Sequence, residues 1–525
     1  MPDRPLFTRR QAIGVGAAGL GALGLGASGT SPASAAPAAS AYPKGIRPST
    51  LHVLQESSLS PAELTLATTL QGQFARHGSE GLYLDIPSLG YHLWLNDLID
   101  RYDVRAQPAD DLWKLVGRSR VGGYLLYRQG TSSVNVATTL AGLTGAVAIE
   151  ESLEPLAIQH GLRKVQDVRD KDDQWVKENY WQKLRHDLAI EQKEEWPERL
   201  RDYATMAGAF TFFDGNSAFR AEVIGDLDDD AAVIGWGDAA NGEDAFIGVN
   251  SDAGVKAIPA DHARNLSVLS GIRAERISQH GRVDPPTPDP DAHYVSFLIT
   301  DGDNIQWMLG DFPTSPRWFG NPNRGRTDLG WGISPSLVDL APSVMRWYYD
   351  QASRDRFVVG PSGGGYLYPS RYPRTALDQH TASLARSMER ADLSVVQIID
   401  FDSFPDAALW STYLKRPQID GLIYLEYSRY DAHKGQVVWA NGKPVISART
   451  MLWDGLPGAD EASVIAELNN ATRNPGSTEG YSIVLWHAWS KSLDDVMTVV
   501  DGLAPHVKVV PPDTLVKMVA RNARP

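Results

Sequence analysis

The chain has 525 residues, a formal net charge of −14 and no cysteine. Its length exceeds what one hydrophobic core usually supports, so we expect two or three domains. The negative charge argues against binding to nucleic acid, whose partners carry basic patches. The lack of cysteine excludes disulfides, thiol catalysis and cysteine-bound metals.

The first 41 residues have the pattern of an export signal. Arg9 and Arg10 precede a glycine-rich, weakly apolar run, and an Ala/Ser/Pro stretch with A-x-A cleavage options follows near residues 33–38. This order is typical of a twin-arginine signal peptide, and a disordered tail with a chance arginine pair is the alternative. The run is too short and glycine-rich for a membrane span, and no later segment supplies one. We therefore expect a secreted or extracytoplasmic protein without a membrane span after signal removal.

Residues 42–282 predict one or two small α/β domains. Short apolar runs such as GLYLDI, GGYLLY and AVIGWG alternate with helical patterns, and residues 174–210 suggest one long charged helix. Residues 283–292 then set four prolines among aspartates, which is the composition of a linker.

Residues 293–525 predict a parallel sheet. Seven apolar, β-branched runs occur here, YVSFLIT, FVVGPS, LSVVQIID, GLIYLEYS, KPVISARTML, YSIVLWHA and VKVVPP. Helical patterns fill several of the gaps, and buried parallel strands are expected to be apolar throughout. We expect an α/β fold with an incomplete, TIM-like (β/α) barrel of about seven strands; an open doubly wound sheet is the alternative.

Polar and aromatic side chains follow these runs, where the loops of a (β/α) barrel carry the chemistry. The catalytic candidates are Asp301, Asp303, Asp400, Glu426 and His487. The candidates for substrate binding are Asn304, Gly363, Gly365, Tyr366, Tyr368, Asp402, Tyr427, Trp453, Asp454 and Trp489. Together they predict a polar cleft with aromatic walls.

Each candidate also has a structural interpretation. An aspartate after a strand often caps a helix or forms an Asx-turn, and His487 fits a core histidine with satisfied hydrogen bonds. Asp301 and Asp303 would point to the same side if the strand pleat continued. Glu426 lies in an apolar strand, where an unpaired carboxylate is costly. For a two-carboxylate glycosidase we expect Asp301 or Asp303 to pair with Glu426 or Asp400.

The segment FVVGPSGGGYLYPSRYP, residues 357–373, allows three interpretations. A phosphate loop is excluded because no lysine follows the glycines. Ser362 fits G-x-S-x-G, and Asp400 or Asp454 and then His487 follow in the order of α/β-hydrolases, but a helix cannot begin at the glycines and prolines after it. In a sugar site, the glycines would allow close backbone approach and Tyr366 and Tyr368 would offer ring faces. Inward packing of both tyrosines is the structural alternative.

The same segment resembles a known family. Residues 363–369, GGGYLYP, reproduce the G-x-G-Y-x-Y-P signature of the GxGYxYP putative glycoside hydrolase family. The runs SFLITDGDNIQW, WGISPSLVDLAP and LWHAWS also resemble its C-terminal domain, and NVATTLAGLTGAVAI and DHARNLSVLSG resemble its N-terminal companion region. The resemblance implies a carbohydrate substrate and carries over no catalytic residue.

Metal and cofactor sites are not predicted. The start and end of the expected barrel resemble polysaccharide deacetylases distantly, but no histidine pair has the H-x-x-x-H spacing of a metal site. A calcium loop at Asp301 would have Phe312 where a glutamate is required. We therefore expect an exported hydrolase of polysaccharides or oligosaccharides without a cofactor. A non-catalytic glycan-binding protein, a deacetylase and a serine esterase are the alternatives.

Overall fold

Three small parallel sheets form the N-terminal region of the computed structural model, which describes residues 42–214, 217–237, 242–279 and 284–523. The predicted export signal and residue 283 of the predicted linker lie outside these ranges. The described residues belong to one contact unit. None of their helices is long and apolar enough to cross a membrane.

The first two sheets have three strands each, in the orders β2-β1-β3 and β5-β4-β6. The first unit contains β1 (Thr50–Gln55), α1 (Pro61–His77), β2 (Glu80–Asp85), α2 (Gly90–Tyr102), β3 (Arg105–Pro108) and α3 (Leu112–Arg118). The second contains β4 (Gly123–Tyr127), α4 (Ser133–Thr144), β5 (Val147–Glu150), α5 (Glu154–Gln159) and β6 (Arg163–Asp167). Helix α1 begins at a capping box, because Ser60 and Glu63 satisfy each other's backbone N–H groups.

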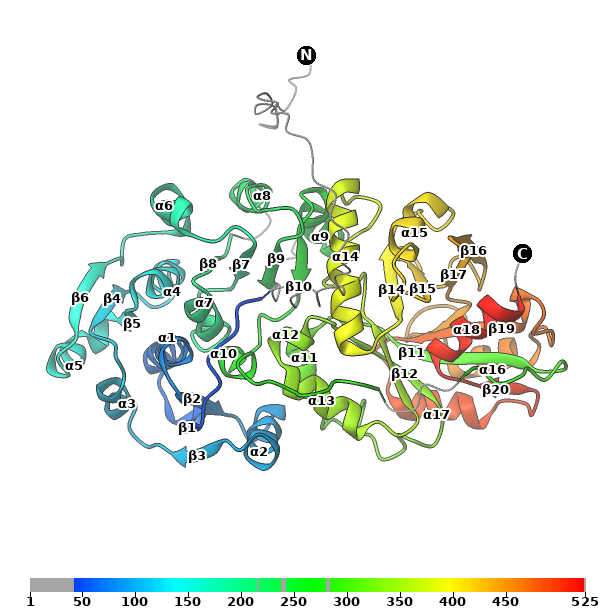
Figure 1. The fold of residues 1–525 in the computed structure, drawn as a ribbon, viewed down its shortest axis with the longest axis horizontal. Coiled ribbons are helices and arrows are strands. Elements are labelled where there is room, and N and C mark those ends of the chain that lie inside the picture. Colours follow the sequence, from blue (N-terminus) through cyan, green and yellow to red (C-terminus); the bar gives the residue numbers. More distant parts are fainter. Residues whose placement is uncertain (1–41, 215–216, 238–241, 280–283, 524–525) are drawn as a thin grey trace, which may run out of the picture. The chain divides into compact units, whose positions relative to one another are not determined.

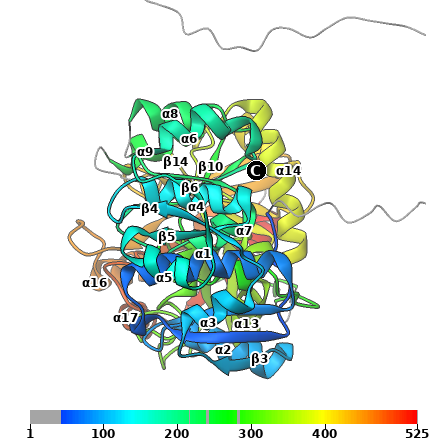
Figure 2. The same ribbon diagram turned by 90° about the vertical axis from the view of Figure 1, so that its left-hand side faces the viewer.

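The third sheet has the order β10-β9-β7-β8. Its unit contains β7 (Leu188–Glu191), α7 (Arg201–Ala207), β8 (Phe210–Phe212), α8 (Ala218–Gly225), β9 (Ala232–Gly235), α9 (Glu243–Asp252), β10 (Lys256–Ile258) and α10 (Leu266–Leu269). Helix α6 (Asp173–Tyr180) precedes this unit and contacts α4 of the second. Figure 2 shows the blue elements of the first unit below the cyan second unit, with green α8 and α9 at the top.

The predicted long helix over residues 174–210 is wrong. It contains α6, β7, α7 and the first residue of β8. All four residues of β7 are buried at the centre of the third sheet, where burial on both faces outweighs helix propensity. Pro197 also interrupts the helical pattern. Overlooking β7 and β8 explains why the sequence suggested fewer small units than the three sheets observed.

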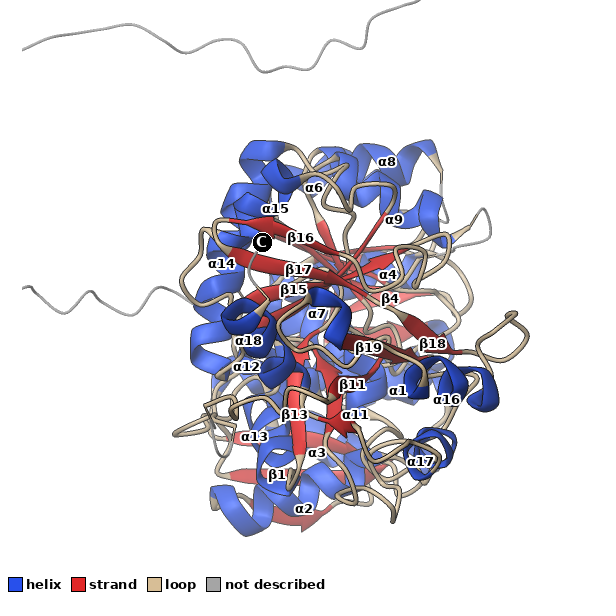
Figure 3. Ribbon diagram, turned by 90° about the vertical axis from the view of Figure 1, so that its right-hand side faces the viewer, coloured by secondary structure: helices blue, strands red, loops and turns tan. Residues whose placement is uncertain are grey.

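The C-terminal region is a large, curled half-barrel sheet (Figure 3) with the order β16-β17-β15-β14-β13-β12-β11-β19-β18, and β20 also pairs with β11. Its strands are β11 (His293–Ile299), β12 (Leu329–Ile333), β13 (Asp355–Val359), β14 (Val395–Asp400), β15 (Gly421–Glu426), β16 (Val437–Ala440), β17 (Lys443–Ser447), β18 (Thr450–Leu452), β19 (Tyr481–Trp486) and β20 (Val507–Val509). All pairs are parallel except β16 with β17. The predicted α/β class is confirmed, whereas a TIM-like barrel is not.

Helices connect and cover these strands. They are α11 (Ile305–Leu309), α12 (Leu337–Leu340), α13 (Pro342–Gln351), α14 (Arg374–Ala391), α15 (Ala407–Leu414), α16 (Glu461–Asn469), α17 (Leu493–Asp501) and α18 (Pro512–Asn522). The last helix, α18, contacts β11, β13, β14, β15, β17 and β19.

Strand β12 was not predicted, and it lies between β11 and β13. Two of its five residues are glycines, which hides the β-branched pattern of a buried strand. A Cβ atom on Gly332 would lie 2.8 Å from the Cα atom of Gly302, so the glycines allow the loop after β11 to cross this strand. The predicted run KPVISARTML also divides, because β17 and β18 lie near opposite ends of the sheet.

The third N-terminal unit packs against the half-barrel. His380 Nδ1 of α14 lies 3.0 Å from Asp230 Oδ1, just before β9, and Figure 1 shows both elements. Ala257 and Tyr366 form an antiparallel bridge, with N–H···O distances of 3.1 and 2.7 Å. The signature loop of the C-terminal region therefore continues the edge of the third sheet.

Candidate active site

A cavity of about 270 Å³ lies at the C-terminal edge of the half-barrel, and we call it the carboxylate pocket. Its carboxyl side chains are Asp301, Asp303, Glu243 and Asp261, and its aromatic side chains are Trp236, Tyr366, Tyr430 and Trp489. Both regions contribute to it, because residues 236–261 belong to the third N-terminal unit. This is the edge at which (β/α) barrels carry their chemistry.

Asp301 and Asp303 reach the pocket through a turn directly after β11. Asp301 has a φ of 61°, so the strand pleat does not continue through this pair. The Trp489 Nε1–H donates a hydrogen bond of 3.1 Å to one Asp301 oxygen, and the Thr300 hydroxyl donates to the other. These two donors fix the orientation of the Asp301 carboxyl group.

Asp303 occupies a different environment, with only 7% of its surface exposed. Burial raises its pKa well above the ordinary value, and the negative charges of Asp301 and Glu243 add to this effect. Two neighbouring carboxyl groups thus have different surroundings: Asp301 accepts two hydrogen bonds, whereas Asp303 is buried and its pKa is raised.

Glu243 was not among the predicted site residues. It begins α9, and its Oε1 atom accepts a hydrogen bond of 2.6 Å from the Tyr366 hydroxyl. The surrounding protein raises the pKa of Glu243, mainly through loss of hydration and also through the charge of Asp301, while the Tyr366 hydrogen bond lowers it. Trp236 stacks beside Tyr366, with ring centroids 6.4 Å apart and planes inclined by 16°.

Asp261 was also missed. It follows β10, is 5% exposed and lines the pocket. Its Oδ1 atom has no hydrogen-bond partner among the described residues, and burial raises its pKa to about 6. The signal for both missed acids was available, since each follows a strand-like run of the N-terminal region, AVIGWG or KAI.

The structure places Asn304, Tyr366 and Trp489 at the pocket, as the sequence suggested. Asn304 has a structural role as well, because its Oδ1 caps α11 by accepting a hydrogen bond of 3.2 Å from Trp307 N. Trp489 is 43% exposed and therefore offers a free ring face beside the acids.

Asp400 and Glu426, the predicted partner acids, do not line the pocket. Asp400 is fully buried and accepts hydrogen bonds from Ser370 N, Ser370 Oγ and Ser403 Oγ at 2.7–2.8 Å. Glu426 is 3% exposed and accepts hydrogen bonds of 3.0 Å from Asp402 N and the Tyr424 hydroxyl. Both acids hold loops in place through these hydrogen bonds. The predicted catalytic pair of Asp301 or Asp303 with Asp400 or Glu426 therefore has to be revised.

Five further candidates also lie outside the pocket lining. Asp402 is exposed, and Tyr427 packs on Phe401 with ring centroids 4.5 Å apart. Trp453 stacks on His487 at 3.5 Å. The remaining contacts are His487 Nδ1 to Ser490 Oγ at 2.9 Å and Asp454 to Lys491 Nζ at 2.6 Å. Burial lowers the pKa of His487, so its neutral form is favoured.

The glycines of the signature loop face protein. Gly363 has a φ of +135°, and a Cβ atom there would lie 2.8 Å from His380 Nε2 in α14. A Cβ atom on Gly365 would lie 2.8 Å from the Ala257 carbonyl oxygen. Glycine at these positions therefore allows α14 and β10 to pack closely against the loop. The close approach of a ligand, which the sequence suggested, is not needed to explain the glycines. Tyr368 is fully buried behind Tyr366. It therefore packs inward, which was the structural alternative for both tyrosines.

Ser362 does not have the surroundings of a nucleophile. It is fully buried, its hydroxyl donates to the Ile399 carbonyl at 3.2 Å, and it accepts from Ile399 N at 3.1 Å. Burial and these two backbone bonds argue against the serine esterase alternative. Among the described residues, no group of three or more His, Asp or Glu side chains is arranged to hold a metal ion.

Four family models match the chain. Residues 291–520 match the "GxGYxYP putative glycoside hydrolase C-terminal domain". Residues 50–120, 121–184 and 186–271 match the "GxGYxYP_N 1st domain", the "GxGYxYP_N second domain" and the "GxGYxYP third domain". The three N-terminal matches correspond to the three small sheets.

A solved structure is similar over almost the whole chain. It is a crystal structure described as that of "a putative hydrolase" from Bacteroides thetaiotaomicron VPI-5482. The identity is 32%, the TM-score is 0.85, and the match covers 93% of this chain and 99% of the other. No curated protein has a matching sequence.

Proposed function

Since the chain belongs to the GxGYxYP putative glycoside hydrolase family, we propose that it hydrolyses glycosidic bonds in the carboxylate pocket. The observation that supports this most directly is the contrast between two acids. Asp303 is buried with a raised pKa, while the neighbouring Asp301 accepts hydrogen bonds from Trp489 and Thr300. Glycosidases use such a pair of carboxyl groups, one protonated and one charged.

In the proposed reaction Asp303 is the general acid. It donates its proton to the glycosidic oxygen while the bond from that oxygen to the sugar carbon breaks. Asp301 supplies the electron pair, either by attacking that carbon directly or by removing a proton from an attacking water. If Asp301 attacks, water then breaks the bond between Asp301 and the sugar carbon: its hydroxyl joins the carbon and its proton passes to Asp303. If Asp301 activates water instead, the hydroxyl joins the carbon, Asp301 releases the proton to solvent and Asp303 takes one up from solvent. Glu243, fixed by Tyr366 and with a raised pKa, is the second candidate for the general acid.

The pocket favours sugars without acidic groups. Among the described residues that line it, four are carboxylic acids and none is Lys, Arg or His. A uronic acid or a sulfated sugar would be repelled by Asp301 and the neighbouring acids. Trp236, Tyr366 and Trp489 supply aromatic surface against which the apolar faces of a neutral or amino sugar can pack.

Hydrolysis of a panel of neutral, amino and acidic polysaccharides tests the proposal, with Asp303→Asn as the matched inactive variant. Release of reducing ends by the wild type and a loss of about 10² or more in the variant are expected. Glycan binding without turnover would instead identify a non-catalytic glycan-binding protein. Equal turnover by both proteins would remove Asp303 from the mechanism.

We also propose that the protein is exported through the twin-arginine route. The support is the sequence of residues 1–41, with Arg9-Arg10 before a glycine-rich run. Conversion of both arginines to lysine should retain the protein in the cytoplasm, as cell fractionation would detect. Unchanged export of the double-lysine variant would contradict the proposal.

A further inference from the structure

The carboxylate pocket adjoins a second cavity, of about 290 Å³. Asn304, Gln306 and Trp489 line both cavities and therefore form the boundary between them. Each volume is close to the lower limit of about 300 Å³ for pockets that enclose small ligands. Either cavity alone suits one sugar ring, and the two together suit a short chain.

The second cavity combines aromatic surface with polar groups. Trp307 and Trp489 contribute indole rings, with centroids 4.9 Å apart and planes inclined by 50°. Trp307 is 4% exposed, and its Nε1–H has no hydrogen-bond partner among the described residues. Since this N–H is not accessible from the cavity, Trp307 contributes ring surface to the lining and no hydrogen bond.

The N-terminal region forms the opposite wall. Leu89 and Tyr91 come from the first unit, and His262 and Arg264 come from the loop after β10. Tyr91 is fully buried, and its hydroxyl accepts a hydrogen bond of 3.0 Å from Arg264 N, which leaves its position fixed. The second cavity exists only where the two regions meet.

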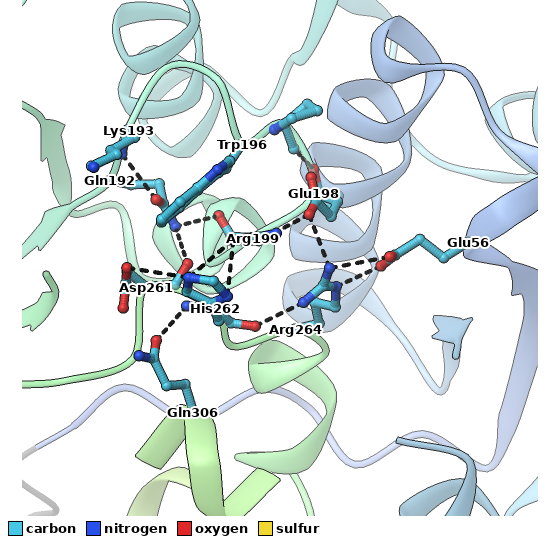
Figure 4. A network of polar contacts seen from close by, with 12 residues as sticks. Glu56, Gln192, Lys193, Trp196, Glu198, Arg199, Asp261, His262, Arg264 and Gln306 are labelled. Carbon is cyan, nitrogen blue, oxygen red and sulfur yellow. Dashed lines mark hydrogen bonds and ion pairs between the residues drawn. The ribbon is translucent and has the colours of Figure 1, made fainter. Parts of the chain in front are cut away.

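Figure 4 shows how this loop is held. The backbone N–H of His262 donates a hydrogen bond of 2.5 Å to Gln306 Oε1, which connects the loop to α11. Arg199 donates to His262 Nδ1 at 3.0 Å, and Trp196 contacts the same ring edge-on at 4.5 Å. A wall fixed in this way can contact a ligand without an added cost of ordering.

Charge in this wall is largely balanced. Arg264 forms two hydrogen bonds with Glu56, at 2.6 and 3.1 Å, and one of 2.9 Å with Glu198 (Figure 4). Its positive charge is therefore compensated within the protein and does not select an acidic ligand. The nearby Asp311 is exposed and adds a negative charge, so the second cavity, like the first, disfavours acidic sugars.

We infer that the protein binds an oligosaccharide of at least two units without acidic groups, one unit in the carboxylate pocket and the next in the second cavity. The inference rests on the proposed function. The loop of residues 261–264 then selects the length of the bound oligosaccharide. The N-terminal units then take part in substrate binding, and the C-terminal half-barrel alone would lack half of the site.

Calorimetric titrations of the full chain test the inference, with the Asp303→Asn variant used so that ligands remain intact. The probes are oligomers of glucose, xylose, mannose and N-acetylglucosamine with one to four units, and galacturonate oligomers for comparison. At least one neutral series should bind about tenfold more tightly at two units than at one, the gain expected from an additional aromatic contact.

Two substitutions in the second cavity should abolish that gain. His262→Ala removes one wall while the backbone donor to Gln306 remains, and Leu89→Trp fills the space. The matched control is His160→Ala, because His160 is exposed and stacks on Trp113 at 5.0 Å in the second unit. The control should retain the full gain at two units.

The outcomes separate this inference from the proposed function, because turnover by the wild type is measured independently of binding. No gain at two units, an undiminished gain in both variants, tighter binding of galacturonate or no binding of any neutral series would each overturn the second cavity as a sugar site. Hydrolysis of single-unit glycosides together with such a result would leave the proposed function standing.

Discussion

The Tyr366 hydroxyl donates a hydrogen bond of 2.6 Å to Glu243 Oε1 and thereby joins the signature loop to the third N-terminal unit. The backbone of Tyr366 also pairs with Ala257 of β10. One residue thus aligns two regions and lines the carboxylate pocket that they enclose. The pocket depends on this junction as much as on the half-barrel.

Tyr366→Phe should lower kcat/KM about tenfold, because Glu243 would lose the donor that orients it while the aromatic face remains. The free energy of unfolding should fall by only about 1 kcal/mol, the net value of one hydrogen bond. Steady-state kinetics and chemical denaturation measure the two effects. Unchanged kcat/KM in a folded variant would show that the hydroxyl has no part in the reaction.

The matched control is Tyr368→Phe. The Tyr368 hydroxyl is buried and has no hydrogen-bond partner among the described residues. Its removal should therefore leave both stability and kcat/KM close to those of the wild type. A loss of activity equal to that of Tyr366→Phe would indicate a general effect on the loop.

Asp303→Asn should stabilise the protein at pH 7 while reducing turnover. Burial raises the pKa of Asp303 above its value in the unfolded chain, so its contribution to stability is complete at low pH. That contribution to the free energy of unfolding is lost as pH rises through the pKa of Asp303 in the folded protein. The loss is about 1.4 kcal/mol for each pKa unit that separates the folded from the unfolded chain. Asparagine does not titrate. The difference in Tm should be largest near pH 7 and shrink toward pH 4.

The pH dependence of activity provides a second readout for Asp303. If Asp303 is the general acid, kcat/KM of the wild type should fall as pH rises through the pKa of Asp303. The residual activity of Asp303→Asn should lack this decline. For the stability prediction, an Asp303→Asn variant that is less stable than the wild type at pH 7 would contradict the raised pKa of Asp303.

Much of the half-barrel could be predicted from the sequence, because buried parallel strands are apolar along their whole length. β11, β14, β15 and β19 are buried at every residue and were recognised for that reason. β12 was missed because Gly330 and Gly332 are required for close packing, and packing against distant residues has no local signature.

The site was only half predictable. Asp301 and Asp303 could be predicted because they directly follow β11, and functional residues of (β/α) barrels lie after the strands whatever packs against them. Glu243 and Asp261 enter the pocket only because the third unit docks on the half-barrel. The hydrogen bond between Glu243 and Tyr366, for example, joins residues 123 positions apart. Asp400 is the last residue of β14 and is held inward by hydrogen bonds from Ser370 and Ser403, which the local pattern does not reveal.

Ser362→Ala should keep nearly full activity and lose about 1–2 kcal/mol of stability, because it removes two buried hydrogen bonds to Ile399. A fluorophosphonate probe should leave Ser362 of the wild type unlabelled, as mass spectrometry of the digested protein would show. Stoichiometric labelling would restore the serine esterase alternative and displace the carboxylate mechanism.

The three glycines of the signature loop should differ sharply in tolerance. Gly363→Ala combines a φ of +135° with a contact of 2.8 Å to His380 Nε2, in a buried environment. A clash of this kind, with a backbone conformation that alanine rarely adopts, should cost about 2 kcal/mol or more. Thermal melts of the purified variants measure this cost.

Gly364→Ala is the matched control, because its nearest contacts would be 3.6 Å from His380 and 3.9 Å from Lys256, ordinary packing distances. It should melt close to the wild type. If the glycines existed to admit a ligand, Gly364→Ala would lose sugar affinity without losing stability. If they admit β10 and α14, as the geometry indicates, Gly363→Ala and Gly365→Ala should lose stability and activity together, because displacing the loop moves Tyr366 away from Glu243.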